Sequence, residues 1–343
     1  MNAAWGEEHV VCDLCGADAP LSLMLARDRL FGLPGAFRLV RCAACGLVYL
    51  CPRPTWERLL RYYPLQGYYD PYRPPAARWG PAARWRRAWK RLALAALRGY
   101  PFPQGKEKAR PRARWLRLVA ILFLPWRTRL EAVPPYRARG RLLDVGCGSG
   151  TYLRAMRDLG WEVCGVEVNA EAARQARERW GLDVRQGTLE EAGLPGSEFD
   201  VITFWHTLEH LPSPRRALAE CRRLLRPGGL IMLETPNCAG PGARLFGERW
   251  FHLDAPRHLY AFTPDTLRRL LAQLGFTAVQ VWPVANALGL AGSLQLIWDE
   301  KRGRVGGRGW RENPLVRCGA WLVSQALLGL GAGDCLRAVA VRP

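Results

Sequence analysis

Four cysteines near the amino terminus have the spacing of a metal site. They form two Cys-x-x-Cys-Gly turns, separated by 26 residues, at Cys12, Cys15, Cys42 and Cys45. Two thiolates three positions apart on a tight turn can both face one ion, and the glycine accepts the positive φ that the turn imposes. The pattern predicts a closed Cys₄ shell around a structural Zn²⁺ ion. Two coincidental pairs or a redox dithiol are the alternative interpretations.

A glycine-rich segment has the composition of a nucleotide-binding turn. An apolar stretch leads into Asp144-Val-Gly146-Cys-Gly148-Ser-Gly150. Glycines have no side chain, so a ligand can approach the main-chain amides closely. Glu167 follows 23 residues after Asp144, at the end of the next apolar stretch. A carboxylate there can accept hydrogen bonds from both hydroxyls of a ribose. A nicotinamide-binding turn is the alternative, but it favours Gly-x-Gly-x-x-Gly without the leading aspartate.

Histidines gather in the later part of the chain. Four of the five lie between Trp205 and His258. Imidazole titrates near neutral pH, so His206, His210 and His258 are candidate general bases, although His210 could equally fix a loop. A loop with Arg257 beside His258 can bind an anion or shape a pocket for an aromatic or sugar group. The residues of this loop that we predict to contact a substrate are Trp250, His252, Arg257, His258 and Tyr260.

Alternating helices and strands are expected to position these residues. The patterns predict helices over 151–159, 169–180 and 214–225, and strands over 163–166, 183–186, 199–204 and 230–234. Thr263-Pro264 is expected to cap a further helix. Strands near 278–282 and 336–341 are expected to be separated by an apolar helical insert. This α/β rhythm predicts a doubly wound, mainly parallel, Rossmann-like sheet with its ligand at the carboxyl ends of the strands.

At these residues the chain resembles the class I S-adenosylmethionine-dependent methyltransferases. The likeness extends from about Arg139 to Trp282 and comprises DVGCGSG, the acid that ends the second strand, FDVITFWHTLEH and LRPGG, in that order. The resemblance implies a seven-stranded methyltransferase sheet and S-adenosylmethionine as the methyl donor. It also implies that the residues around the donor are Asp144, Gly146, Gly148, Gly150, Glu167, Thr188, Leu189, Trp205 and His206.

Two narrower resemblances concern the acceptor. The segment from Phe204 to His210 is similar to its counterpart in ubiquinone-type O-methyltransferases, which have an acid where this chain has His206. The paired cysteine turns ahead of the core resemble deoxysugar C-methyltransferases, which have a larger carboxyl-terminal domain. The chain has no Asn/Asp-Pro-Pro-aromatic sequence after the fourth strand and no Pro-Cys dipeptide. These absences disfavour methylation of a nucleic-acid base.

The positive charge is concentrated in one segment. The chain has 50 Lys and Arg against 30 Asp and Glu, a net charge of +20, and residues 73–141 hold 19 of these cations with two acids. We therefore expect four parts. They are a zinc ribbon (1–55), a Tyr-rich and then Arg/Trp-rich basic helical insert (56–138), the methyltransferase core (139–282), and an apolar helical insert with the final strand of the sheet (283–343).

The basic insert suggests contact with a membrane. A helix over 84–98 would place Trp85, Trp89, Leu92 and Ala96 on one face, and the apolar run 118–126 is too short to span a bilayer. Both would suit the boundary of an anionic membrane, whereas helices packed on the core with a solvated Arg face are the alternative. The amino terminus has no basic signal-peptide region, so we expect a cytoplasmic protein.

These patterns together predict an enzyme. The favoured function is S-adenosylmethionine-dependent methyl transfer to a hydroxyl or carbon of a small-molecule, sugar or lipid-linked acceptor, at the cytoplasmic membrane surface. The alternative is an RNA methyltransferase that grips the phosphate backbone with its ribbon and basic insert, although nucleic acid is the less expected partner. A second alternative is a binding module without catalytic activity.

Overall fold

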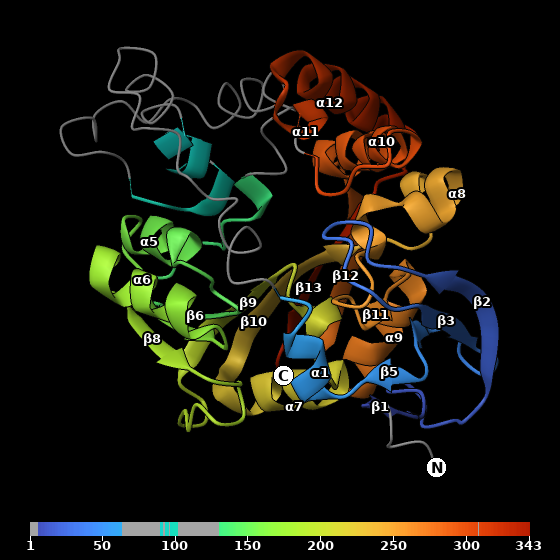
Figure 1. Cartoon of the computed structure of the whole chain (residues 1–343). Coiled ribbons are helices and arrows are strands. Elements are labelled where there is room, and N and C mark those ends of the chain that lie inside the picture. The colour runs from blue at the N-terminus through green and yellow to red at the C-terminus, as the bar shows by residue number, and fades with distance from the viewer. Residues whose placement is uncertain (1–5, 64–89, 92, 96, 102–129, 308) are drawn as a thin grey trace. The chain divides into compact units, whose positions relative to one another are not determined.

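The computed structural model describes the 343-residue chain except for residues 1–5, 64–89, 92, 96, 102–129 and 308 (Figure 1). The chain divides into two compact units. The first comprises residues 1–64, 193–197 and 203–343, and the second comprises residues 65–192 and 198–202. The described residues between 90 and 98 are helical, as predicted. The rest of the predicted basic insert, including the apolar run 118–126, lies largely outside the described residues.

A seven-stranded sheet confirms the predicted Rossmann-like class. Its strand order is β12-β13-β10-β9-β6-β7-β8. The strands are β6 (Arg141–Val145), β7 (Glu162–Glu167), β8 (Asp183–Gln186), β9 (Phe199–Trp205), β10 (Leu225–Pro236), β12 (Thr277–Val284) and β13 (Cys335–Val341). β6, β7 and β8 pair in parallel, whereas β13 is antiparallel to both β10 and β12.

The second unit contains two strand-helix repeats. Helix α5 (Thr151–Arg157) follows β6, and α6 (Ala170–Trp180) follows β7. Helix α6 begins where the Asn169 side chain accepts the Ala172 N–H at 2.8 Å, and it ends at Gly181, whose φ is 59°. Both helices start within one residue of the predicted positions. Leu142, Leu143 and Val166 of β6 and β7 are buried in the core of the unit.

In the first unit, local capping signals determine where the helices begin. Helix α7 (Pro214–Leu224) is capped by Ser213, and α9 (Pro264–Gln273) starts with a capping box between Thr263 and Thr266, as predicted. Strand β10 starts five residues before its predicted start. Gly228 and Gly229 exchange hydrogen bonds of 2.8 and 2.9 Å with the main chain of Arg342, so the end of the chain extends the pairing into the predicted turn.

The cysteine-rich segment forms a small antiparallel sheet. This sheet contains β2 (Pro20–Ala26), β3 (Phe37–Cys42) and β4 (Val48–Leu50). Strands β1 (Glu7–Glu8) and β5 (Arg53–Pro54) pair with each other in a separate two-stranded sheet, and helix α1 (Trp56–Leu60) follows β5. Strand β11 (Tyr260–Ala261) joins β2, β3 and β4 as the fourth strand of their sheet, in the order β11-β4-β3-β2, with Tyr260 opposite Tyr49. The histidine-containing loop is therefore built into the cysteine-rich sheet, which the sequence did not predict.

Three helices lie between β12 and β13, as the apolar insert predicted. They are α10 (Ala287–Lys301), α11 (Gly309–Glu312) and α12 (Pro314–Gly329), and they pack on one another (Figure 1). Short elements complete the unit: η2 (Leu208–His210), α8 (Pro241–Phe246), η3 (Gly247–Arg249) and η4 (Phe251–Leu253). Among the described helices, none is both long and apolar enough to cross a membrane.

Candidate active site

The glycine turn of the second unit leaves one side open for a ligand. Gly146, Gly148 and Gly150 have φ values of 72°, 54° and 77°, a region that favours glycine. A Cβ added to Gly148 would have no described protein atom within 4 Å, whereas one added to Gly150 would lie 2.5 Å from Leu182 Cδ1. Gly148 therefore offers an approach to the main chain. At Gly150, by contrast, a side chain would collide with Leu182, so glycine is required there by packing.

The Glu167 carboxylate lies against this turn. The side chain is 4% exposed and accepts the N–H groups of Gly148 and Asn169, each at 2.8 Å. Burial raises the pKa of Glu167, and the amide hydrogen bonds partly offset that effect. Each carboxylate oxygen can accept a second hydrogen bond, so a ribose hydroxyl fits the same group. Asp144, at the end of β6, is buried in the same unit.

Thr188 and Leu189, two of the predicted donor-binding residues, follow β8 in a tight turn. The Thr188 N–H donates to Glu191 Oε2 at 3.0 Å, and the Glu191 N–H donates to Thr188 Oγ1 at 3.3 Å. Leu189 is buried. Thr188 therefore stabilises the turn with its side chain, and Leu189 supplies an apolar surface that suits a planar base.

His206, in the first unit, is held between two carboxylates. Its Nδ1 lies 3.5 Å from Glu209 Oε1, and its Nε2 lies 3.3 Å from Glu234 Oε1. Burial disfavours the imidazolium, but the hydrogen bonds to both acids outweigh it and raise the pKa of His206 to about 10. His206 is therefore a cation at neutral pH, which argues against its predicted role as a base. Its φ of 53° is unusual for a residue other than glycine.

Glu209 is a buried anion, and Glu234 is an anion with 14% of its side chain exposed. Burial alone would raise the pKa of each, but the hydrogen bond to His206 and the neighbouring positive charges together outweigh burial and lower both pKa values to about 2. Glu209 also accepts the Thr235 hydroxyl at 2.9 Å, and Arg337 forms an ion pair with Glu234. The Arg337 guanidinium lies 5.6 Å from the centre of the half-buried Trp205 ring. Neither acid was a predicted site residue, although Glu209 stands beside His210 in the sequence.

Three further histidines, His210, His252 and His258, belong to the same cluster as His206 and Glu209. Burial lowers the pKa of His210 to about 4 and that of His252 to about 3. His252 stacks on His206 with ring centres 5.9 Å apart, and His210 contacts His258 edge to face at 4.5 Å. Ligand atoms of Glu209, His210 and His258 lie within 4.8 Å of one another. This trio could coordinate a cation, but protonated His206 already balances the Glu209 charge.

His258 has a fixed ring orientation. Its Nδ1 lies 2.8 Å from the main-chain oxygen of His252. A carbonyl oxygen only accepts hydrogen bonds, so Nδ1 carries the proton and the lone pair stays on Nε2. Asp254 Oδ2 lies 3.9 Å from Nε2. His258 is therefore the predicted base whose ring orientation suits proton removal.

Arg257 is fully buried, contrary to the prediction that it contacts a substrate. Its guanidinium donates two hydrogen bonds to Asp28, at 2.7 and 3.0 Å, and others to Asp254 and to the main-chain oxygen of Tyr62. Its side chain thus ties the cysteine-rich module to the histidine loop. Asp28 was not predicted, because nothing in its local sequence distinguishes it.

Trp250 and Tyr260 are also buried, at 3% exposure each. Trp250 packs edge to face on His252, and the Tyr260 hydroxyl donates to the Pro212 main-chain oxygen at 3.1 Å. Like Arg257, they differ from their predicted role because neighbouring protein groups already surround them. Of the five predicted substrate residues, His258 is the one with partial exposure, and His252 contacts the cationic His206.

The four predicted metal ligands come together. The sulfur atoms of Cys12, Cys15, Cys42 and Cys45 all lie within 4.8 Å of one another. Cys12 Sγ is 3.3 Å from Cys45 Sγ, and Cys15 Sγ is 3.6 Å from Cys42 Sγ. Tetrahedral zinc with Zn–S bonds of about 2.3 Å requires S···S separations of about 3.8 Å. The four thiols therefore fit one Zn²⁺ ion with little rearrangement.

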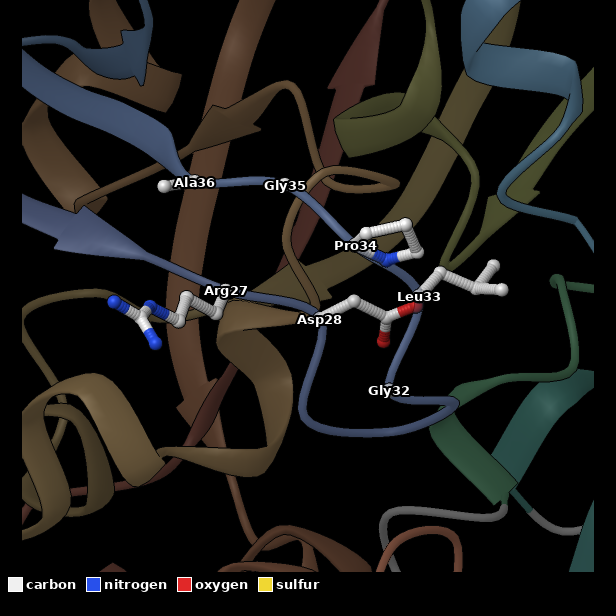
Figure 2. Close-up of a pocket in the computed structure, with 7 residues that line it drawn as sticks. All are labelled: Arg27, Asp28, Gly32, Leu33, Pro34, Gly35 and Ala36. Carbon is white, nitrogen blue, oxygen red and sulfur yellow. The ribbon is translucent and has the colours of Figure 1, made fainter.

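A hollow of about 400 Å³ lies in the loop between β2 and β3 (Figure 2). Figure 2 shows the Asp28 side chain directed toward Leu33 and Pro34, while Arg27 extends away from them. The residues that line it are Arg27, Asp28, Gly32, Leu33, Pro34, Gly35 and Ala36. None of the predicted cofactor or catalytic residues lines this hollow.

Residues 114–281, just under half of the chain, match the methyltransferase domain family. The seven-stranded sheet with its antiparallel β13 agrees with that match. This part of the chain is therefore similar to a methyltransferase domain.

Two named proteins are similar in sequence to part of this chain. The ubiquinone biosynthesis O-methyltransferase of Cereibacter sphaeroides is 34% identical over 162 residues, which cover 44% of this chain and 65% of that protein. A probable S-adenosylmethionine-dependent methyltransferase of Mycolicibacterium smegmatis is 32% identical over 160 residues, covering 46% and 60%. The chain thus spans less than two thirds of the length of both relatives. A solved methyltransferase from Archaeoglobus fulgidus is 21% identical, with a TM-score of 0.43 over 69% of this chain and 97% of its own.

Proposed function

We propose that this protein catalyses S-adenosylmethionine-dependent methylation of a hydroxyl or carbon on a small-molecule, sugar or lipid-linked acceptor, at the cytoplasmic face of a membrane. The methyltransferase domain and the named relatives support a small-molecule acceptor. No feature of the described residues favours the alternative of RNA methylation.

One observation carries the proposal: the buried Glu167 carboxylate contacts the amide of Gly148, and the outer side of Gly148 is open. A glycine with an open side allows a ligand to reach the main chain, and a neighbouring carboxylate can hold its sugar. When bound there, S-adenosylmethionine would supply a methyl group activated by its positively charged sulfur. The residues proposed to hold it are Asp144, Gly146, Gly148, Glu167, Thr188, Leu189 and Trp205.

We propose that His258 accepts the proton of the acceptor hydroxyl at Nε2. Its Nδ1–H donates to a main-chain oxygen, which fixes the ring in the orientation and tautomer that a base requires. His206, as a cation, would stabilise the negative charge that develops on the acceptor oxygen. Arg257, Trp250 and Tyr260 are proposed to hold the loop in place rather than to touch the acceptor.

We further propose a structural Zn²⁺ ion in the cysteine shell. Four thiolates and no open position are typical of zinc that stabilises a fold. The ion would stabilise the small sheet that β11 joins, and thereby support the loop that carries His258.

Calorimetry with S-adenosylhomocysteine tests the proposed donor site. Removing a charged hydrogen-bonding group costs a factor of about 10 to 100 in affinity, so Glu167→Ala should weaken binding by that factor. Glu171→Ala is the matched control, because Glu171 lies in the same unit and its side chain is 50% exposed. Equal affinities of Glu167→Ala and the wild type, with both folded by circular dichroism, would refute the proposed donor site.

A further inference from the structure

Helix α12 presents an apolar face to solvent along its whole length. Leu315 and Leu330, at its two ends, are each 82% exposed, and Leu322 and Val323 between them are 57% and 48% exposed. At 3.6 residues per turn these side chains lie on one side of the helix, together with the exposed Cys318 and Ala326. Arg317 is the one charged residue of α12, and it falls outside this stripe.

The opposite side of α12 is the one that packs. Ala320 and Ser324 are buried, and the Ser324 hydroxyl donates to the Ala320 main-chain oxygen at 2.7 Å. Surface helices normally bury their apolar side and expose a polar one. In α12 the exposed side is itself apolar, so a partner that removes it from water would stabilise it.

Cations and tryptophans surround the start of α12. Lys301, at the end of α10, and Arg302 and Arg304, in the loop that follows, are exposed, and Arg317 is exposed one turn into α12. The Arg302 guanidinium lies 4.0 Å from the centre of the Trp298 ring, which packs on Trp310 at 5.3 Å. Of the nearby acids, Glu300 is paired with Arg249, which leaves Glu312 among the described residues of 300–317.

We propose that α12 and the cations Lys301, Arg302 and Arg304 form a docking surface for a membrane that contains anionic lipid. Exposed leucines would enter the acyl boundary, while Arg and Trp would lie at the headgroups. Figure 1 shows α10, α11 and α12 grouped together, in agreement with their mutual packing. A second copy of the chain is a poorer partner, because two such patches would bring like charges together. This inference deepens the proposed function, since it specifies the surface that would bring the protein to a lipid-linked acceptor.

Vesicle flotation of the full-length protein tests this surface. The wild type should float with phosphatidylcholine vesicles containing phosphatidylglycerol at low salt, and should float poorly with phosphatidylcholine alone. The double variant Leu322→Ser/Leu330→Ser should bind at least about tenfold more weakly, because two leucines lose their burial in the membrane. Both leucines are exposed, so the folded state should tolerate serine.

The matched control is Leu21→Ser/Leu25→Ser, which alters leucines of β2 that are 57% and 53% exposed. Flotation equal to that of the wild type is expected for this control. Equal flotation of the α12 variant and the wild type would overturn the inference. So would absence of flotation of the wild type, or a wild-type dimer that the α12 variant abolishes, as measured by sedimentation. Binding of S-adenosylhomocysteine should be unchanged in the α12 variant, so failure of the donor site and failure of this surface are separate results.

Discussion

The charge on His206 depends on two buried carboxylates. Glu209 and Glu234 keep it protonated at neutral pH, while burial keeps His210 and His252 uncharged. The cluster therefore combines one cation with neutral imidazoles, a distribution that suits a cationic stabiliser beside a separate base. His258 is the residue best oriented for the second role.

The neutral histidines make stability depend on pH. The pKa of His252 falls from 6.5 to about 3 on folding, so the unfolded chain binds an extra proton between these values and stability falls as the pH is lowered through that window. Between pH 7 and 5 this histidine should cost about 2 kcal/mol of unfolding free energy. In His252→Gln the difference between the two pH values should shrink by about that amount in urea titrations. The exposed-histidine control His9→Gln should change the difference much less, and an equal effect of both substitutions would contradict the assignment.

His206, Glu209 and Glu234 contribute little to the difference in unfolding free energy between pH 7 and pH 5. The pKa of His206 is raised, so its stabilising effect is complete below pH 6.5 and is lost only as the pH rises toward 10. The pKa values of the two acids are lowered to about 2, so their contribution is present above about pH 4.5 and is lost below that value.

Residue spacing predicts some site residues and misses others for a physical reason. Glu167 and the glycine turn are close in sequence and directly follow adjacent strands, so their meeting could be predicted. The contact between Asp28 and Arg257 joins residues 229 positions apart, and no local pattern encodes it. Glu234 and Arg337 likewise meet only because β10 pairs with β13.

At the scale of elements, periodicity and capping residues predicted most boundaries, whereas long-range pairing altered the rest. Helix α9 starts at the predicted Thr263-Pro264 pair. Strand β10 is longer than predicted because Arg342 forms main-chain hydrogen bonds with Gly228 and Gly229 near its start. Strand β11 forms because β4 is its pairing partner. A two-residue strand has no recognisable signal of its own in the sequence.

The loop between β2 and β3 and the histidine loop are joined by a buried ion pair that can be tested. Asp28 and Arg257 are both fully buried at their side chains, so removal of Asp28 leaves a cation with one carboxylate, Asp254. We expect Asp28→Ala to lower the free energy of unfolding by about 3 kcal/mol, measured by urea denaturation. Asp18→Ala removes an ion pair to His9 whose side chains are 55% exposed, and it should cost less than about 1 kcal/mol. Similar losses of unfolding free energy in the two variants would contradict the proposal that the buried Asp28–Arg257 ion pair joins the two loops.

At the scale of the whole molecule, the cysteine-rich module belongs structurally to the first unit. The chain leaves that unit at residue 64 and rejoins it at residues 193–197 and 203–343. Sequence predicted a separate module, because the cysteine turns are local, but it could not predict that β11 completes the module's sheet. The module therefore supports the loop that carries the proposed base, in addition to holding the four cysteines of the proposed zinc site.

This connection leads to a prediction about zinc. The purified protein should contain about one Zn²⁺ per chain by mass spectrometry of metals, and Cys15→Ser should lose most of it, because three thiolates bind the ion far more weakly than four. The proposed ion would hold together Cys42 at the end of β3 and Cys45 just before β4, so its loss should loosen the pairing of these two strands. Because β11 pairs with β4, the pairing of β11 should loosen as well. Hydrogen exchange at the amides of residues 259–262 should therefore become faster in Cys15→Ser, although these residues lie far away in the sequence. Cys318→Ser, at another exposed cysteine, is the control and should change neither the zinc content nor the exchange. Loss of zinc with unchanged exchange at residues 259–262 would show that the module folds independently of the histidine loop.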